Sequence, residues 1–297
     1  MQNMNFEEML KEYARRTEEY LAACYPDGDC DLRKIVDAEK YSLLSGGKRI
    51  RAYLVFAFCE MLGKSETEAA PFACAVEMVH AYSLIHDDLP CMDDDDYRRG
   101  KPTSHKVFGE ATAVLAGDAL LTKAFEVAAG NGGVSSECVL EAVISLAKAA
   151  GDMGMVGGQI LDLDAENTPD GDIDKLRKIH LLKTGAMIKV SARLGCLAAG
   201  ICGGDVMRDA EAYAEKIGVA FQIVDDVLDV VGDSAVLGKN IGSDENNQKL
   251  TYMSFYTPDE AMALARTLTD EAVAIISKYK GSDRLVAFAE YLLNRNH

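Results

Sequence analysis

The sequence of 297 residues predicts a single all-α domain, residues 1–297. Three observations support this prediction. Apolar side chains recur at the three- to four-residue spacing of an amphipathic helix along most of the chain. We find no succession of short strands in which apolar and polar residues alternate. The prolines and clustered glycines that break regular structure are spread evenly, and no long linker or low-complexity tract divides the chain.

The helical spacing begins near the N-terminus, where Phe6, Met9, Leu10 and Tyr13 recur with charged residues between them. It returns in the later stretches 52–62, 69–88, 111–129, 136–164, 173–202, 206–231 and 258–279. Glycine and proline mark the breaks, for example at Pro26, Pro90, 130–133, 203–204 and 232–242. The sequence therefore predicts a bundle made almost entirely of helices.

The net charge restricts the partners of this protein. With 31 Lys and Arg against 48 Asp and Glu, the formal net charge is −17. This argues against binding nucleic acid or an anionic membrane surface by bulk electrostatics. No stretch of 18 apolar residues could span a membrane, and the polar N-terminus does not resemble a signal peptide. We therefore expect a cytoplasmic protein whose eight scattered cysteines are reduced, buried thiols.

Two acidic motifs are the most informative feature of the chain. The first runs from His86 to Asp96, and the second is Asp225-Asp226-Val227-Leu228-Asp229. Carboxylates this close repel one another, and apolar neighbours make their desolvation costly, so a cation must neutralise them. Mg²⁺ is the natural candidate, because it prefers oxygen ligands and bridges carboxylates to substrate phosphates. Two such sites suggest a diphosphate held between carboxylates through metal ions.

The second motif lies within a stretch of helical spacing. Asp225 and Asp229 are four residues apart, so they share one face of a helix, whereas Asp226 points partly away. A solvated acidic surface is the alternative. It is disfavoured because the preceding residues 219–224 are mostly apolar.

In the first motif, Pro90 ends the preceding helix because its ring cannot continue the hydrogen-bond ladder. Asp93 can therefore fold back toward Asp87 from a loop. An EF-hand calcium loop is disfavoured, since Arg98 stands at the position where that loop requires glycine. An acidic surface loop remains the alternative.

Basic residues flank both motifs despite the acidic total. The segment Gly46-Gly47-Lys48-Arg49-Ile50-Arg51 is the most specific, because glycine lets a backbone approach an anion and arginine offers phosphate a bidentate fork. It is not a P-loop, since it lacks the GxxxxGK[ST] pattern. His80 lies two helical turns before Asp87, although a lone helical histidine is more often a core residue. Further basic candidates are Arg98, Arg99, Lys101, Lys183, Lys239 and Lys249.

Taken together, these segments resemble the bacterial trans-isoprenyl diphosphate synthases of the farnesyl and geranylgeranyl type. The matching segments are GGKRIR (46–51), the stretch 77–121 with the first acidic motif, GMVGGQILDL (154–163), KTGA (183–186), GVAFQIVDDVLDVVGD (218–233), LGKNIGSD (237–244) and KLTY (249–252). The resemblance implies an isoprenoid-synthase-type helical bundle around a deep central pocket, and a homodimer. It also implies Mg²⁺-dependent, head-to-tail condensation of isopentenyl diphosphate with dimethylallyl or geranyl diphosphate, with three Mg²⁺ ions per active site or Mn²⁺ in their place.

The resemblance also implies a role for each candidate residue. The metal ligands would be Asp87, Asp93 and Asp225, supported by Asp88, Asp229 and Asp244. Isopentenyl diphosphate would be held without metal by Gly47, Lys48, Arg51, His80 and Arg99. The allylic diphosphate would be contacted by Arg98, Lys183, Lys239 and Lys249. The carbocation would be faced by dipoles of Thr184 and Gln222, and the released diphosphate would remove the proton.

The length of the product would depend on the depth of the pocket. Tyr82 is five residues before Asp87, about 7.5 Å along a helix axis at ~1.5 Å per residue, and Ser83 is one turn below Asp87. By resemblance, an aromatic residue at Tyr82 together with the Pro90-Cys91 insert is typical of C15 synthases. We therefore expect farnesyl diphosphate as the main product, although Tyr82 could be ordinary core packing.

Other functions remain open at this stage. A geranylgeranyl diphosphate synthase is one alternative, although by resemblance the plant-like C20 synthases tend to have a small or flexible residue where this chain has Tyr82. A terpene cyclase usually carries Asn, Ser and Glu in its second metal motif, where this chain has a second Asp-rich motif. A His-Asp phosphohydrolase would need a second histidine further upstream than His80. A non-catalytic prenyl synthase subunit usually loses aspartates from one motif, and both motifs are intact here.

Overall fold

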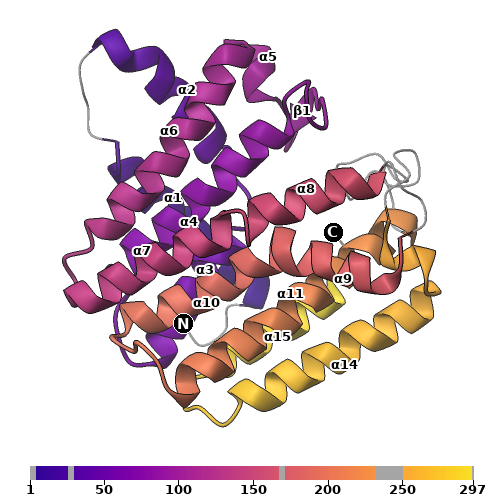
Figure 1. Cartoon of the computed structure of the whole chain (residues 1–297). Helices are drawn as coiled ribbons and strands as arrows, with labels where there is room; N and C mark the ends of the chain where they lie inside the picture. Colours follow the sequence, from indigo (N-terminus) through magenta and orange to yellow (C-terminus); the bar gives the residue numbers. More distant parts are fainter. Residues whose placement is uncertain (1–4, 26–29, 167–170, 232–249, 296–297) are drawn as a thin grey trace. The chain divides into compact units, whose positions relative to one another are not determined.

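The computed structural model describes residues 5–25, 30–166, 171–231 and 250–295, and its described part is all-α, as predicted (Figure 1). Its only strands among these residues are β1 (Tyr97–Arg98) and β2 (Lys101–Pro102), which pair antiparallel. The chain divides into two compact units. None of the described helices is both long enough and apolar enough to cross a membrane.

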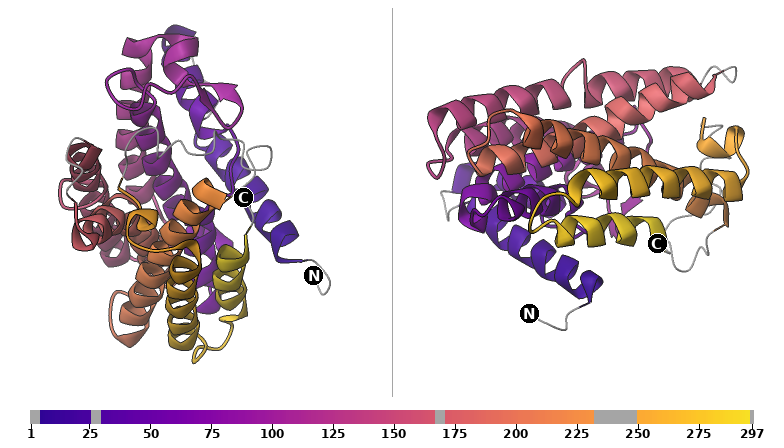
Figure 2. Two further views of the ribbon diagram at one scale, coloured as in Figure 1. Left: turned by 90° about the vertical axis from the view of Figure 1, so that its right-hand side faces the viewer. Right: turned by 90° about the horizontal axis from the view of Figure 1, so that it is seen from below.

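The first unit comprises residues 1–143 and 197–200. Its described elements are α1 (Phe6–Ala23), the 3₁₀ turn η1 (Cys30–Leu32), α2 (Arg33–Leu43), α3 (Ile50–Met61), α4 (Glu66–Asp87), α5 (Ser104–Phe108) and α6 (Glu110–Ala129), drawn in indigo to magenta in Figure 2. The centre of this unit is α4, which packs against α3 and α6. Both α3 and α4 are buried over most of their length, because apolar residues occupy nearly all of their faces.

The second unit comprises residues 144–196 and 201–297, and α7 (Ser136–Ala150) begins before it and continues into it. Its further described elements are α8 (Met155–Glu166), α9 (Ile173–His180), the π-helical turn η2 (Leu181–Gly185), α10 (Ala186–Ala198), α11 (Asp205–Val231), the 3₁₀ turn η3 (Tyr252–Ser254), α14 (Pro258–Ile276) and α15 (Asp283–Asn294). The long helix α11 packs against α14, and the apolar core between them includes Ile223, Tyr252 and Ala265.

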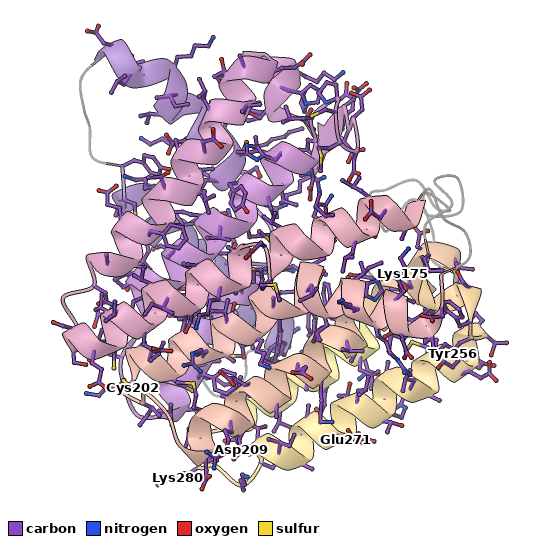
Figure 3. All side chains as sticks on the ribbon, viewed as in Figure 1. Lys175, Cys202, Asp209, Tyr256, Glu271 and Lys280 are labelled. Atoms are coloured by element: carbon purple, nitrogen blue, oxygen red, sulfur yellow. The ribbon has the colours of Figure 1, made fainter. Side chains whose placement is uncertain are left out.

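Polar contacts fasten the far ends of α11 and α14. Asp209 of α11 binds Lys278 at 2.7 Å and accepts a hydrogen bond from Tyr279, at the turn that Lys280 marks in Figure 3. Glu271 of α14, also labelled there, pairs with Lys216 of α11. These contacts are partly exposed, so the apolar core supplies most of the stability of this helix pair.

Two predictions at this level were wrong. The expected continuous helix over 136–164 is broken at 151–154, where a Cβ at Gly154 would lie 2.2 Å from the carbonyl oxygen of Ala149. Only glycine permits this tight turn. Cys91 is exposed rather than buried, and none of the cysteines whose side chains the structure describes forms a disulfide.

Candidate functional site

The first acidic motif lies where α4 ends, in the first unit. The loop that follows folds back on the helix end, because the backbone N–H of Asp93 donates to the carbonyl of Asp87 at 2.9 Å. The N–H of Asp94 similarly donates to the carbonyl of Leu89 at 3.1 Å. These two bonds bring Asp87 and Asp93 to one end of the helix, with Asp93 exposed. Hard, solvent-accessible carboxylates of this kind fit Mg²⁺, which usually keeps several waters.

Asp88 differs from its neighbour Asp87. Its side chain is only 3% exposed, and its Oδ1 accepts a hydrogen bond from Nε of Arg98 at 2.6 Å. Burial raises the pKa of the Asp88 carboxyl, and the bond from Arg98 opposes that shift. The protein itself therefore supplies the countercharge of Asp88, which suits a supporting role better than direct ligation of a metal.

A further group of candidate ligands was missed in the sequence. Asp94, Asp96 and the buried His105 offer ligand atoms that lie within 4.8 Å of one another. Nε2 of His105 has no hydrogen-bond partner among the described residues, and its Nδ1 lies 3.2 Å from Oγ1 of Thr103. Asp96 also binds Lys106 at 2.6 Å. The run of aspartates indicated part of this cluster, but nothing in the sequence predicted that His105 lies beside it.

A basic pocket opens in the first unit, with an empty volume of about 450 Å³ that includes open solvent. Its charged and titratable lining consists of Tyr41, Arg49, His80, Asp88, Arg98, Arg99 and Lys101. The β1–β2 hairpin supplies Arg98 and Lys101, and α4 supplies His80 and Asp88. The pocket thus concentrates positive charge within an acidic protein, and it brings together three of the predicted binding residues. Lys48 and Arg51 are not among its lining residues.

One glycine of the 46–51 segment, Gly47, makes room for a cation. Gly47 has φ +116°, and a Cβ there would lie 2.8 Å from Cζ of Arg99. The Arg99 guanidinium donates to the carbonyl of Gly46 and lies 3.4 Å from the hydroxyl of Ser45. We expected these glycines to let the backbone approach an anion, whereas Gly47 lets an arginine side chain lie across the loop.

The three basic residues of the same segment have different surroundings. Arg49 is 5% exposed, pairs with Glu77 at 3.4 Å and Glu18 at 3.1 Å, and is therefore a structural cation. Burial lowers the pKa of Arg51, with the charge of Glu77 opposing. Lys48 is partly exposed. The sequence alone could not predict which of these three basic residues would be buried in ion pairs that stabilise the fold.

His80 is electrically neutral in this setting. Burial lowers its pKa well below the usual value of 6.5, and the positive charges of Arg51 and Arg99 lower it further. A neutral imidazole still offers one donor and one acceptor nitrogen. His80 can therefore hydrogen-bond to a ligand in the pocket, while Arg98, Arg99 and Lys101 supply the charge.

The second acidic motif lies on α11, in the second unit. Asp225 is 45% exposed and Asp229 is partly exposed, one helical turn further on. Asp226 is buried, and its Oδ2 accepts a hydrogen bond from the backbone N–H of Tyr252 at 2.8 Å. Asp226 therefore holds η3 in place and leaves Asp225 and Asp229 as candidate ligands. The guanidinium of Arg295 binds Oδ1 of Asp225 at 2.6 Å.

The predicted catalytic residues of this unit lie around the π-helical turn η2. Oγ1 of Thr184 donates to Oε1 of Gln222 at 3.0 Å, and Nζ of Lys183 binds Oδ2 of Asp162 at 2.6 Å. A Cβ at Gly158 would lie 2.3 Å from the backbone nitrogen of Lys183, so this glycine lets α8 approach the turn closely. A π-turn adds a residue to the helix and is frequent at functional sites. The partner role of Asp162 was not predicted.

The remaining predicted residues are described only in part. Tyr82 is 6% exposed, and its ring packs edge-on against His86, with centroids 5.7 Å apart. The hydroxyl of Ser83 donates to the carbonyl of His80 at 2.9 Å. Lys239, Asp244 and Lys249 lie outside the described residues.

Comparisons with known proteins agree with one another. A family model described as polyprenyl synthetase matches residues 33–286. The chain is 43% identical to a farnesyl diphosphate synthase from Escherichia coli, over 99% of this chain and 100% of that one. It is also 43% identical to a geranylgeranyl diphosphate synthase from Cyanophora paradoxa, over 99% and 98%. A geranyltransferase from Helicobacter pylori, solved in complex with magnesium and isoprenyl diphosphate, matches with a TM-score of 0.83 and 31% identity, over 99% and 97%.

Proposed function

The chain belongs to the polyprenyl synthetase family, and from that premise we propose that it is a Mg²⁺-dependent farnesyl diphosphate synthase. Prenyl transfer with chain elongation is the activity that the family match supports. In the proposed reaction, isopentenyl diphosphate is joined head to tail first to dimethylallyl diphosphate and then to geranyl diphosphate. We also propose that the two units serve this reaction as one domain, since the family match runs through both.

The basic pocket of the first unit carries this proposal. It gathers Arg99 and Lys101 around a neutral His80 in a protein of net charge −17. Arg98, which the resemblance assigned to the allylic diphosphate, is paired with Asp88 in the same pocket. Arg99 contacts the hydroxyl of Ser45 and the carbonyl of Gly46 rather than a carboxylate, and burial lowers its pKa. Partly buried guanidinium groups facing an open pocket suit a bidentate anion such as a diphosphate. We assign this pocket to isopentenyl diphosphate, held without a metal ion.

The acidic motifs supply the second requirement, which is stabilisation of a departing diphosphate. We propose Asp87 and Asp93 from the first motif, and Asp225 and Asp229 from the second, as the carboxylates that hold Mg²⁺ on the allylic diphosphate. When bound, Mg²⁺ neutralises the charge that develops on that leaving group. Lys183, held in place by Asp162, adds a positive charge that is oriented before the leaving group departs.

Thr184 and Gln222 have a different task, because the reaction produces an allylic cation. The hydroxyl of Thr184 donates to the amide oxygen of Gln222 and so fixes the direction of that dipole. An amide oxygen stabilises positive charge, yet it is too weak a nucleophile to trap the cation. No side chain is required as a base in this scheme, since the released diphosphate accepts the proton.

The product length rests on Tyr82. This ring is buried in α4, five residues before Asp87, and it packs edge-on against His86. A rigid aromatic ring at this depth favours a C15 product. The alternative is a geranylgeranyl diphosphate synthase, because relatives with that name are as similar as the farnesyl diphosphate synthase.

A product assay tests the proposal. The protein is incubated with Mg²⁺, isopentenyl diphosphate and, in turn, C5, C10 and C15 allylic diphosphates, and the dephosphorylated alcohols are sized. We expect farnesol from the C5 and C10 starters and little product from C15. Geranylgeraniol as the main product would refute the C15 assignment but keep the mechanism. No condensation with any starter would refute the enzyme and favour a non-catalytic subunit.

We further propose a homodimer, in which exposed apolar side chains of α6 contribute to the interface. Leu115 is 59% exposed and Val114 is 39% exposed on that helix. Light scattering after size-exclusion chromatography should give the mass of two chains, and Leu115→Glu should shift the protein toward one. A wild-type mass of one chain would contradict this proposal.

A further inference from the structure

The C-terminal arginine of the described chain occupies the second acidic motif. α15 ends at Asn294, and Arg295 follows with an extended backbone of φ −69° and ψ 148°. Its side chain is 5% exposed, which is unusual for an arginine. Since both α15 and α11 belong to the second unit, this contact is internal to that unit.

The contact is built from three interactions with one turn of α11. Nη2 of Arg295 donates to Oδ1 of Asp225 at 2.6 Å and to the carbonyl of Phe221 at 2.9 Å. The guanidinium carbon lies over the ring of Phe221, 3.9 Å from its centroid. Phe221 and Asp225 are four residues apart, so a single planar guanidinium reaches both. This geometry is a cation site, because a ring face, a carbonyl and a carboxylate all attract positive charge.

Burial of Arg295 also has an unfavourable contribution to the free energy of this contact. Nε of Arg295 is buried and has no hydrogen-bond partner among the described residues. Burial lowers the pKa of the Arg295 guanidinium, with the charge of Asp225 opposing. Arg49, whose Nε also has no partner among the described residues, binds two carboxylates and a carbonyl, whereas Arg295 binds one carboxylate and one carbonyl. The cost of taking the guanidinium out of water offsets part of its attraction to Asp225, so a more strongly bound cation can compete for this carboxylate.

We propose that Arg295 is a resident countercation of the second acidic motif, which a divalent metal must displace from Asp225. This inference rests on the proposed function, in which Asp225 is a metal ligand. A guanidinium and a divalent cation on the same carboxylate repel each other, whichever oxygen each one uses. In the metal-free protein the Arg295 side chain thus neutralises Asp225. Binding of the metal ion to the second acidic motif therefore requires release of Arg295.

The proposal predicts that removing Arg295 tightens metal binding. A charge-assisted hydrogen bond corresponds to about a ten- to hundredfold change in a dissociation constant, and the cost of burying the guanidinium offsets part of this, which leaves about a three- to tenfold change. Arg295→Met keeps an apolar side chain against the Phe221 ring and deletes the charge. Mn²⁺ affinity is measured without substrate, from the electron paramagnetic resonance signal of the free ion. We expect the site that is lost in Asp225→Asn to bind Mn²⁺ about three- to tenfold more tightly in Arg295→Met.

A matched variant separates this effect from a change in net charge. Arg208→Gln also removes one cation from the second unit, but its partner Asp205 lies at the opposite end of α11 and is 83% exposed. We expect its Mn²⁺ affinity to equal that of the wild type. In the double variant Arg295→Met with Asp225→Asn, the gain should disappear. Equal tightening in Arg208→Gln, or a gain that survives Asp225→Asn, would overturn the proposal.

A second readout does not depend on metal affinity. Without metal, Arg295→Met has lost the ion pair between Arg295 and Asp225, so the melting temperature should fall, and Mn²⁺ should raise it by more than in the wild type. If Arg295→Met does not fold, Arg295→Gln is the replacement, since glutamine also removes the charge but keeps a polar side chain. The proposal is overturned if the folded variant binds Mn²⁺ with the same affinity as the wild type, or if neither protein binds Mn²⁺ detectably. If Mn²⁺ affinity is unchanged in Arg295→Met but the wild type still forms prenyl product, the proposed function stands. If Asp225→Asn binds Mn²⁺ as the wild type does, Asp225 is not a metal ligand.

Discussion

The position of Gly47 beneath Arg99 leads to a sharp prediction about isopentenyl diphosphate binding. In Gly47→Ala, the new methyl group would lie 2.8 Å from Cζ and 2.9 Å from both Nη atoms of Arg99, so the guanidinium must move. The backbone φ of +116° adds strain of about 1–3 kcal/mol for a residue with a side chain. We expect the variant to fold with reduced stability and with Arg99 displaced from the pocket.

The size of the kinetic effect follows from the bond that Arg99 would lose. A charge-assisted hydrogen bond is worth about 1.5–3 kcal/mol, which corresponds to about a ten- to hundredfold rise in KM for isopentenyl diphosphate. Because this diphosphate does not leave in the reaction, kcat should change little. Initial rates measured at saturating geranyl diphosphate and varied isopentenyl diphosphate give both constants.

Gly46→Ala is the matched control for this prediction. Gly46 also has a positive φ, +86°, so alanine there adds comparable strain, yet a Cβ at this position meets nothing within 4 Å. We expect a lower melting temperature for both variants but a raised KM only for Gly47→Ala. Equal KM values for the two variants would refute the argument that Gly47 acts by making room for Arg99. An effect of Gly47→Ala that persists in an Arg99→Gln background would refute it as well.

Three further predictions concern other parts of the site. Tyr82→Ala should shift the product from C15 toward C20 when the dephosphorylated alcohols are sized, and an active variant with unchanged product would exclude Tyr82 as the floor of the pocket. Asp162 binds Lys183 at 2.6 Å, so Asp162→Asn should release this lysine and raise KM for geranyl diphosphate about tenfold. KM for isopentenyl diphosphate should not change; equal changes in the two KM values would contradict this prediction. Burial lowers the pKa of His180 to about 4, so the unfolded chain binds more protons than the folded chain as pH falls from about 6.5 to 4. Protonation of this histidine in the unfolded chain should therefore lower the free energy of unfolding by about 3 kcal/mol across that window. His180→Gln should reduce the dependence of this free energy on pH, measured by urea unfolding at several pH values; the same pH dependence in both proteins would refute this role of His180.

The sequence predicted those parts of the structure that depend on local pattern. Helical spacing located most of the helices, and the apolar surroundings of Asp225 correctly indicated a largely buried helix. The break at 151–154 and the π-turn at 181–185 were not predicted, because both depend on close contacts between backbone segments. Gly154 and Gly158 are required by those contacts, but in the sequence they resemble any other helical glycine.

The same limit applies to the charged residues of the site. Arg49, Asp162 and Arg295 acquire their partners only through the fold, from residues far away in the sequence. Composition indicated that basic residues would neutralise some carboxylates. It could not indicate that Arg49 would be buried against Glu77 while Arg99 would remain at the pocket, since the two residues carry the same chemistry.

Both acidic motifs contain a pair of adjacent aspartates, and the fold divides each pair in the same way. Successive residues of a helix point about 100° apart, so one carboxylate of each pair faces outward and the other faces the protein. Asp88 turns inward to Arg98 at 2.6 Å, and Asp226 turns inward to the N–H of Tyr252 at 2.8 Å. Asp87 and Asp225 are left more accessible. The inward aspartate of each pair fixes a neighbouring segment, the β1–β2 hairpin or η3, against the helix that presents the outward one. Substituting Asp226 should therefore weaken metal binding indirectly, through loss of η3, and Asp226→Asn, which can still accept the Tyr252 hydrogen bond, should be much milder than Asp226→Ala.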